Sequence, residues 1–304
     1  MSFLALSVTL PTQQSAGRMR VWRALRALGS ATLRDGVYLL PDSPAHTQAL
    51  GSIAEDVKSV AGTADIYCLD GRDDTQRQSL IALFDRQEDY AALLKAIQAA
   101  NPAEAKALRA LQREFSALAA IDFFPGEARR QAEAALKALV ARATGEPVDA
   151  AGRIRRLASA EFQGRVWATR KNPWVDRLAS AWLIQRHIDP RARFVWLAEP
   201  TLCPPEALGF DFDGAVFTHV EGRVTFEVLA ASFGLADDPA LGRIATIVHF
   251  LDVGGVPVAE AAGIEAVLAG ARASAATDDE LLSEASRLFD NLFIHYQQEH
   301  ARAG

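Results

Sequence analysis

Cysteine is scarce in this chain of 304 residues, which contains only Cys68 and Cys203. Two thiols are too few for a disulfide framework or for a metal cage made of thiolates. Cys68 falls within a predicted strand, where we expect it to be buried rather than reactive, and Cys203 precedes two prolines with no obvious base. The scarcity excludes a disulfide-stapled domain and leaves no candidate thiol nucleophile.

Several other signatures are also missing. The sequence has no run of eighteen apolar residues, so no membrane-spanning helix is expected. Its first residues have neither the basic start nor the small-residue cleavage site of a secretory signal. The sequence contains no GxSxG, P-loop or GxGxxG motif. It therefore lacks the common signatures of serine hydrolases, P-loop nucleotide-binding proteins and dinucleotide-binding folds. The expectation is a globular, cytosolic protein.

Charge is unevenly divided along the chain. The net charge is −6, from 32 basic and 38 acidic residues, which argues against a general nucleic-acid coat. Residues 1–60 carry +2 and residues 61–152 carry −3, whereas residues 153–193 carry +7 and residues 194–304 carry −12. The mean charge therefore hides two cationic stretches, residues 1–34 and the segment around 153–193, beside an acidic C-terminal third.

The first 70 residues have the pattern of a β-α-β-β-α-β unit. Asp35-Gly36 lies between two short strand-like runs and is the strongest hairpin signal in the chain. The expected strands are 3–10, 31–34, 37–40 and 64–69, and the expected helices are 15–29 and 44–60. This order predicts a ferredoxin-like fold. Residues 74–142, broken at Asn101-Pro102 and Phe124-Pro125-Gly126, predict three further helices that pack on the sheet.

The stretch 145–152 is the best candidate for a linker, so the chain is expected to form domains at 1–145 and 153–304. The second domain is predicted to be mixed α/β and rich in helices, giving an α/β (α+β) protein overall. Its expected strands are 165–169, 193–197, 215–219 and 224–226, and its expected helices are 174–187, 226–233, 239–251 and 278–299.

A basic loop connects the first strand and helix of the second domain. Arg170 and Lys171 precede the helix and Arg177 lies in its first turns. Helix N-termini offer free amide donors and a positive dipole, so this loop is a candidate oxyanion site. The same cations could instead form ion pairs with Asp176 and the acidic C-terminal third.

Two histidines and two carboxylates suggest a metal site. His249 and Asp252 are spaced i, i+3 on one predicted helix, while His219 ends a predicted strand and Glu227 follows eight residues later. These ligand types suit a single iron, manganese or zinc ion. The alternative is that the histidines are satisfied core residues. A rival pair, His295 and Glu299 near His300, is expected to lie on a solvated helix face.

The first predicted helix carries an arginine stripe with no acidic residue. The stripe and the following hairpin supply five candidate DNA-binding residues, Arg18, Arg20, Arg23, Arg26 and Arg34, with Trp22 among them. Such a stripe could contact phosphates. A solvated helix face explains the pattern equally well, and no helix-turn-helix is evident.

Several of these segments together resemble the chromate-resistance ChrB family. In the N-terminal half the resemblance rests on Leu10-Pro-Thr12, Arg20-Val-Trp-Arg23, Leu28-Gly29, Asp35-Gly-Val-Tyr-Leu-Leu-Pro41 and Ile121-Asp-Phe-Phe124. In the C-terminal half it rests on Asp176–Ile184, His187-Ile-Asp-Pro190, Phe217-Thr-His219, Thr225-Phe-Glu227 and Val248-His249. The first half is also similar to the ferredoxin-like portion of PaaX-type repressors. Val224 and Phe250 stand where the family often has Cys and Asp.

The resemblance implies a cytosolic, chromate-responsive transcriptional regulator encoded with a chromate efflux pump. On this hypothesis the basic loop holds chromate or a related oxyanion, the acidic third holds the metal, and the arginine stripe meets promoter DNA in a homodimer. The alternatives are a metal-dependent enzyme of chromate or oxidative-stress detoxification, and an adaptor that dimerises through the helix at 278–299.

Overall fold

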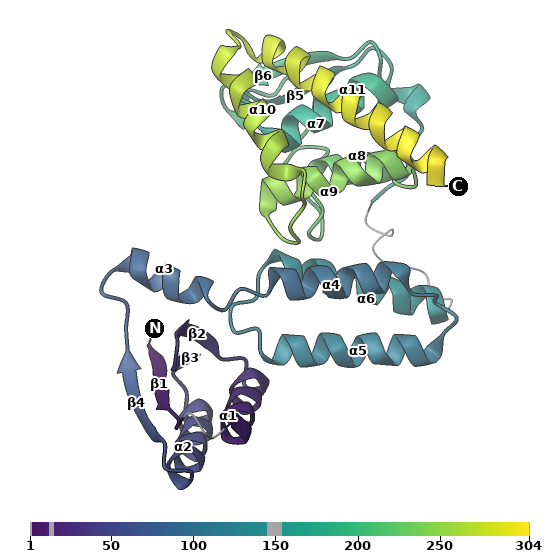
Figure 1. Cartoon of the computed structure of the whole chain (residues 1–304). Helices are drawn as coiled ribbons and strands as arrows, with labels where there is room; N and C mark the ends of the chain where they lie inside the picture. The colour runs from purple at the N-terminus through teal and green to yellow at the C-terminus, as the bar shows by residue number, and fades with distance from the viewer. Residues whose placement is uncertain (1, 12–14, 145–153, 304) are drawn as a thin grey trace. The chain divides into compact units, whose positions relative to one another are not determined.

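The computed structural model describes residues 2–11, 15–144 and 154–303 (Figure 1). The chain divides into two compact units, Met1–Ala132 and Glu133–Gly304. The predicted linker at 145–152 lies outside the described residues, so the domain boundaries 1–145 and 153–304 stay a prediction.

The first unit begins with the predicted β-α-β-β-α-β order. Its elements are β1 (Phe3–Thr9), α1 (Ser15–Ala27), β2 (Ala31–Arg34), β3 (Val37–Pro41), α2 (Pro44–Ser59) and β4 (Thr63–Leu69). The strands form one antiparallel sheet in the order β2-β3-β1-β4, which confirms the ferredoxin-like arrangement. Gly36 turns the predicted hairpin with φ of 74°, and a Cβ there would meet the carbonyl oxygen of Val8 at 2.7 Å.

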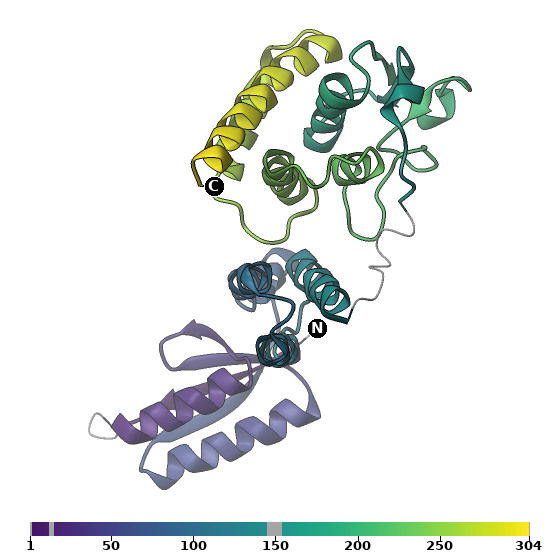
Figure 2. The same ribbon diagram turned by 90° about the vertical axis from the view of Figure 1, so that its right-hand side faces the viewer.

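Both faces of this sheet are partly covered. The helices α1 and α2 pack on one face (Figure 2), where Leu6, Leu25 and Val57 are buried together. On the other face Phe3 and Leu39 pack against Phe84, with further aromatic contacts from the segment before α6. Cys68 is exposed, so the expectation that it is buried is wrong. It lies on β4, an edge strand that exposes most of its residues.

Four helices follow the sheet where the sequence predicted three. They are α3 (Asp74–Ala82), α4 (Gln87–Ala99), α5 (Ala105–Ala120) and α6 (Glu127–Thr144). The missed break separates α3 from α4, where Phe84 turns inward and is only 1% exposed, while the guanidinium of Arg86 donates a hydrogen bond to the carbonyl of Gly29. The boundary between the two compact units falls within α6.

The second unit is built on a small parallel sheet. Its strands β5 (Val166–Arg170), β6 (Arg193–Leu197) and β7 (Leu208–Gly209) have the order β6-β5-β7. Its helices are α7 (Val175–Leu183) with a π-helical turn at Ile184–Ile188, α8 (Thr225–Ser232), α9 (Pro239–Val253), α10 (Ala261–Ser274) and α11 (Asp278–Ala303). Short 3₁₀ turns occur at Ser159–Phe162 and Pro200–Leu202. The mixed α/β class and the helix-rich second part are thus confirmed.

Two predicted strands of this unit are wrong. Residues 215–219 form only an isolated bridge, between Phe217 and Phe210, and residues 224–226 belong to the start of α8. The helix is favoured at that point because a buried carboxylate from α7 accepts hydrogen bonds from its first amides. The helix α10 was not predicted.

The core of the second unit surrounds Trp167 and Trp182, both fully buried. The indole of Trp182 donates a hydrogen bond to Asp290 of α11, which also receives two from Arg186. Asp189 is buried and accepts hydrogen bonds from the amides of Gly164 and Arg165. The contacts of Asp290 hold α7 and its π-helical turn against α11. Those of Asp189 join the end of this turn to the segment that leads into β5. None of the described helices is both long and apolar enough to cross a bilayer.

Candidate functional site

Three carboxylates converge on one imidazole in the second unit. The Nε2 atom of His219 lies 3.3 Å from Asp176 Oδ2, 3.5 Å from Asp211 Oδ1 and 3.5 Å from Asp252 Oδ2. These four residues, called the His219 cluster below, come from four separate segments of the chain. The side chain of His219 is 41% exposed whereas that of Asp176 is 1% exposed, so the cluster extends from the core to the surface.

Asp176 is held by the start of a helix. It lies in the first turn of α7, and its carboxylate accepts hydrogen bonds of 2.9 Å from the amides of both Thr225 and Phe226, the first residues of α8. Amides at a helix start lack partners within the helix and carry a positive dipole, so a buried carboxylate is stabilised there. Asp176 therefore links α7 to α8 and presents one oxygen to His219.

The predicted anion-binding residues border this cluster. Arg177 Nε donates to Asp211 Oδ2 at 2.9 Å, and its Nη1 donates to the carbonyls of residues 170, 171 and 172 at 3.3–3.4 Å. The exposed Arg170 donates to the carbonyl of Asp211, and Lys171 is also exposed. The ion-pair alternative is thus the arrangement seen for Arg177, while Arg170 and Lys171 remain accessible to solvent.

Two residues that accept hydrogen bonds from Arg177 have a left-handed backbone conformation. Asn172 and Asp211 each have φ of 55°, which is uncommon for residues other than glycine but tolerated by Asn and Asp. One offers its carbonyl to Arg177 and the other its carboxylate. Such conformations are retained where surrounding contacts impose them, often at functional sites.

Mutual interaction shifts the pKa values of the cluster. Hydrogen bonds to Asp176 and Asp211 raise the pKa of His219 to about 10, so its imidazole is a cation at neutral pH. Burial, reinforced by the charges of Asp176 and Asp211, raises the pKa of Asp252 to about 6. Burial likewise raises the pKa of Asp176. Burial acts in the same direction on Asp211, but hydrogen bonds from His219 and Arg177 outweigh it and lower the pKa of that carboxyl.

The predicted metal ligands fall into two pairs. His219 and Asp252 belong to the His219 cluster, whereas His249 Nδ1 contacts Glu227 Oε2 at 2.9 Å. Glu227 also accepts the amide of Val224 at 2.9 Å and so helps to begin α8. The rival pair, His295 and Glu299, lies 3.5 Å apart with both side chains more than half exposed, on a solvated helix face as expected.

Another combination of residues has the spacing of a metal site. One ligand atom from each of Asp176, Asp211 and His219 lies within 4.8 Å of the other two, the single such group in the described ranges. Two carboxylates with one imidazole are ligands that manganese, iron and zinc accept. A divalent cation would also replace the imidazolium charge that now faces the carboxylates, so the residues fit such an ion.

Sequence reasoning overlooked Asp176 and Asp211 as site residues. The sequence did carry a signal for Asp176, because Ala179 and Ser180 at i+3 and i+4 place it on a buried part of α7. A carboxylate buried there needs a hydrogen-bond or charge partner. Asp211 had none, since it lies outside any helix or strand, between Phe210 and Phe212. Its role depends on a chain path that spacing does not reveal.

The candidate DNA-binding arginines lie on and near α1. All five, Arg18, Arg20, Arg23, Arg26 and Arg34, have exposed side chains. The guanidinium of Arg26 lies over the ring of Trp22 at 5.2 Å, and Trp22 itself is 44% exposed. The helix therefore presents cations and an aromatic ring to solvent on one surface.

Comparisons with known proteins agree with this architecture. Two family models match, "Protein ChrB, N-terminal" over residues 18–101 and "ChrB, C-terminal domain" over residues 167–296. Protein ChrB of Cupriavidus metallidurans is 46% identical over 316 aligned positions, which cover 99% of this chain and 97% of that protein. No solved structure matches. The two family models and the 46% identity to this relative show that the chain belongs to the ChrB family.

Proposed function

We propose that this protein is a chromate-responsive regulator of a chromate-resistance operon. It acts in the cytoplasm as a homodimer, binds an oxyanion and a metal ion in its second unit, and meets promoter DNA through Arg18, Arg20, Arg23, Arg26 and Arg34. The observation that carries the proposal is the charge arrangement at the His219 cluster, where cations and carboxylates face one another at the surface.

The oxyanion belongs beside Arg170, Lys171 and Arg177. The Arg177 guanidinium points at Asp211, and so does the His219 imidazolium while no metal ion is bound there. A tetrahedral dianion that bonds to these cations competes with Asp211, and Asp211 is also held by the hydroxyl of Thr225 at the start of α8. Release of Asp211 would loosen α8 from α7. The anion therefore has the differential affinity for two states that any allosteric effector requires.

The metal belongs where the ligand atoms converge. Asp176, Asp211 and His219 supply the closest set, with Asp252 beside it, in place of the predicted set of His219, Glu227, His249 and Asp252. Glu227 and His249 support the fold around α8 and α9 in this proposal. When bound, the ion supplies positive charge that attracts an oxyanion.

A gel shift with the protein's own promoter tests the regulatory proposal. Chromate is expected to change the mobility of the complex, while sulfate, a dianion of the same shape, serves as the control. The matched variants Arg170→Gln and Arg193→Gln both remove an exposed arginine, but only the first borders the cluster. The regulatory proposal is wrong if chromate leaves the mobility of the complex unchanged at low salt. Light scattering tests the homodimer separately, and a monomeric mass in solution would contradict it.

The second candidate is a metal-dependent enzyme that acts on chromate or on oxidative-stress products. It is favoured by one observation, the partial exposure of His219, which would let a substrate reach an ion held by Asp176, Asp211 and His219. Metal analysis of the purified protein separates the cases. One redox-active ion per chain in the wild-type protein, lost in Asp176→Ala but kept in the matched surface variant Asp213→Ala, supports the enzyme, and no bound metal in the wild-type protein removes both metal proposals.

A further inference from the structure

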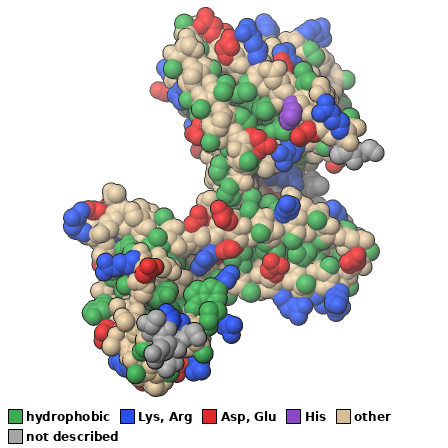
Figure 3. Space-filling model, in the orientation of Figure 1, with side chains coloured by type: hydrophobic (Ala, Val, Ile, Leu, Met, Phe, Trp, Pro, Cys, Tyr) green, Lys and Arg blue, Asp and Glu red, His purple; other side chains and the backbone are tan. Residues whose placement is uncertain are grey.

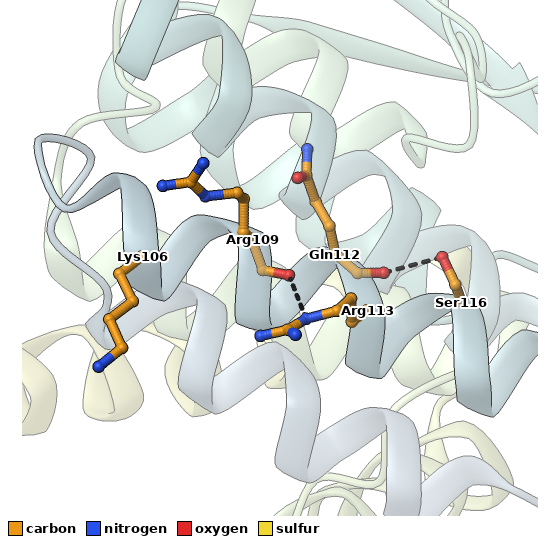
Figure 4. Close-up of a pocket in the computed structure, with 5 residues that line it drawn as sticks. All are labelled: Lys106, Arg109, Gln112, Arg113 and Ser116. Carbon is orange, nitrogen blue, oxygen red and sulfur yellow. Dashed lines mark hydrogen bonds between the residues drawn. The ribbon is translucent and has the colours of Figure 1, made fainter.

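The outward face of α5 carries hydrogen-bond donors along several turns. Five exposed residues line a shallow hollow of about 470 Å³ there, Lys106, Arg109, Gln112, Arg113 and Ser116. This set is called the α5 cationic face. Figure 4 shows its side chains leaving successive turns of one helix, and in Figure 3 lysine and arginine side chains gather along the lower edge of the region that holds α5.

Helix geometry explains why these residues share one face. At about 100° per residue, positions 106, 109, 112, 113 and 116 fall within an arc of about 120°. The opposite arc holds Leu111, which is buried, and Phe115, whose ring contacts that of Tyr90 on α4. Packing through Leu111 and Phe115 therefore directs the cationic face away from α4.

The cations of this face have no acidic partner among the residues that the structure describes. Lys106, Arg109 and Arg113 take part in no ion pair within the described part of the chain. Glu114 is the single carboxylate of α5, and it projects about 100° from Arg113 around the helix. Two other exposed arginines of the first unit do pair within a few residues, Arg72 with Asp73 and Arg130 with Glu127.

Local hydrogen bonds orient part of the face. Arg113 Nε donates to the carbonyl of Arg109 at 3.3 Å, and the Ser116 hydroxyl donates to the carbonyl of Gln112 at 2.8 Å. The Nη groups of Arg113, the whole guanidinium of Arg109 and the Lys106 ammonium stay available. Amide, guanidinium and ammonium donors around an open hollow, whose five described lining residues are all exposed, fit a repeating anion rather than a small ligand held in a closed pocket.

We propose that the α5 cationic face binds the phosphate backbone of duplex DNA. It spans about 10 Å from Lys106 to Arg113, at 1.5 Å per residue, and duplex DNA has one phosphate per strand for about every 3.4 Å of its helix axis. Three cations can therefore meet neighbouring phosphates at once. Contacts of this kind position a protein on DNA without reading its sequence. The inference rests on the proposed DNA-binding function and adds a second contact surface to α1.

The salt dependence of binding to a random-sequence duplex tests this surface. Each phosphate contact adds about 0.9 to the slope of log affinity against log salt concentration. The triple variant Lys106→Gln, Arg109→Gln, Arg113→Gln is expected to lower the slope by about 2.7. Between 50 and 200 mM salt, the wild-type protein should accordingly lose about 40-fold more affinity than the variant does.

Two variants control for net charge and for folding. The triple variant Lys58→Gln, Arg193→Gln, Arg302→Gln removes the same charge from exposed positions on α2, β6 and α11, and its slope should fall by less than 1. The pair Arg109→Lys, Arg113→Lys keeps the charge and should keep the wild-type slope. Circular dichroism of every variant checks that the helix content of the protein is unchanged.

The outcomes separate this inference from the proposed function. An unchanged slope in the α5 triple variant overturns the inference, even if the promoter complex still responds to chromate. A reduced slope supports it, even if chromate has no effect on the promoter complex. Binding to polyglutamate that is tighter than binding to the duplex, and that the α5 triple variant loses, would assign the face to an acidic protein partner and would also overturn the inference.

Discussion

The exposed basic side chains of α1 and α5 in the first unit and the enclosed Arg177 of the second unit have opposite surroundings. On α1 and α5 the basic side chains are exposed, and among the described residues those of α5 form no ion pair with a carboxylate. In the second unit Arg177 is only 17% exposed and bonds to Asp211 and three carbonyls. Burial decides the difference, because a desolvated charge requires a partner and a hydrated charge does not. Residue type alone therefore does not identify a ligand-binding cation. Substitution of enclosed and of exposed charged residues tests this contrast.

Removal of the Asp176 carboxylate should have the largest effect. Asp176→Ala strips the first amides of α8 and the His219 ring of a buried acceptor, with an expected loss of about 3–5 kcal/mol in the free energy of unfolding. Urea denaturation measures this loss. The exposed Asp213→Ala should change stability by less than about 0.5 kcal/mol. Equal stabilities for the two variants would contradict the anchoring role of Asp176.

Loss of the Arg177 guanidinium should lower the free energy of unfolding by a smaller amount, about 2 kcal/mol. The loss is smaller because Asp211 keeps its hydrogen bonds from His219 and Thr225. Arg177→Met tests this, since it retains the packing of the stem. A double-mutant cycle with Asp211→Asn isolates the ion pair, and the two effects should be non-additive. Simple additivity would mean that Arg177 acts through its three carbonyl contacts and not through Asp211.

Local signals predicted most of the fold. Asp35-Gly36 marked the hairpin, Pro and Gly marked most helix ends, and hydrophobic spacing placed the elements of the ferredoxin-like unit. The failures were tertiary in origin. Phe84 breaks α3 from α4 because the sheet offers it a buried place, and Thr225 begins a helix because Asp176 lies beneath its amide.

The candidate site was only half predictable for the same reason. His219 and Asp252 were chosen by residue type, and the structure places them 3.5 Å apart. Glu227 and His249 were chosen in the same way and instead form a separate pair. Which side chains meet depends on how α7, α8 and α9 pack, and that packing distributes hydrophobic contacts over many residues that carry no chemical signature.

The buried Asp189 extends the contrast to pH. Burial by itself would raise its pKa, but hydrogen bonds from the amides of Gly164 and Arg165 and from the indole of Trp167 hold the pKa below its usual value. A depressed folded-state pKa stabilises the protein above the unfolded value of about 3.9, and this stabilisation is lost as pH falls through the folded value. The stability gap between wild-type protein and Asp189→Asn should therefore shrink from pH 7 to pH 3. A gap that widens toward acid would contradict this sign.

The smallest effect on stability is expected on α1. Arg20 and Arg23 are exposed and water already solvates their charges, so the double variant Arg20→Gln, Arg23→Gln should change the free energy of unfolding by less than about 0.5 kcal/mol. The same variant should weaken binding to promoter DNA and lower the salt slope by about 1.8, if each arginine meets one phosphate. Denaturation and salt titration of one sample compare the two effects directly. Unchanged binding would leave α1 a solvated face, and a large loss of stability would mean that its arginines, like Arg177, hold the fold together.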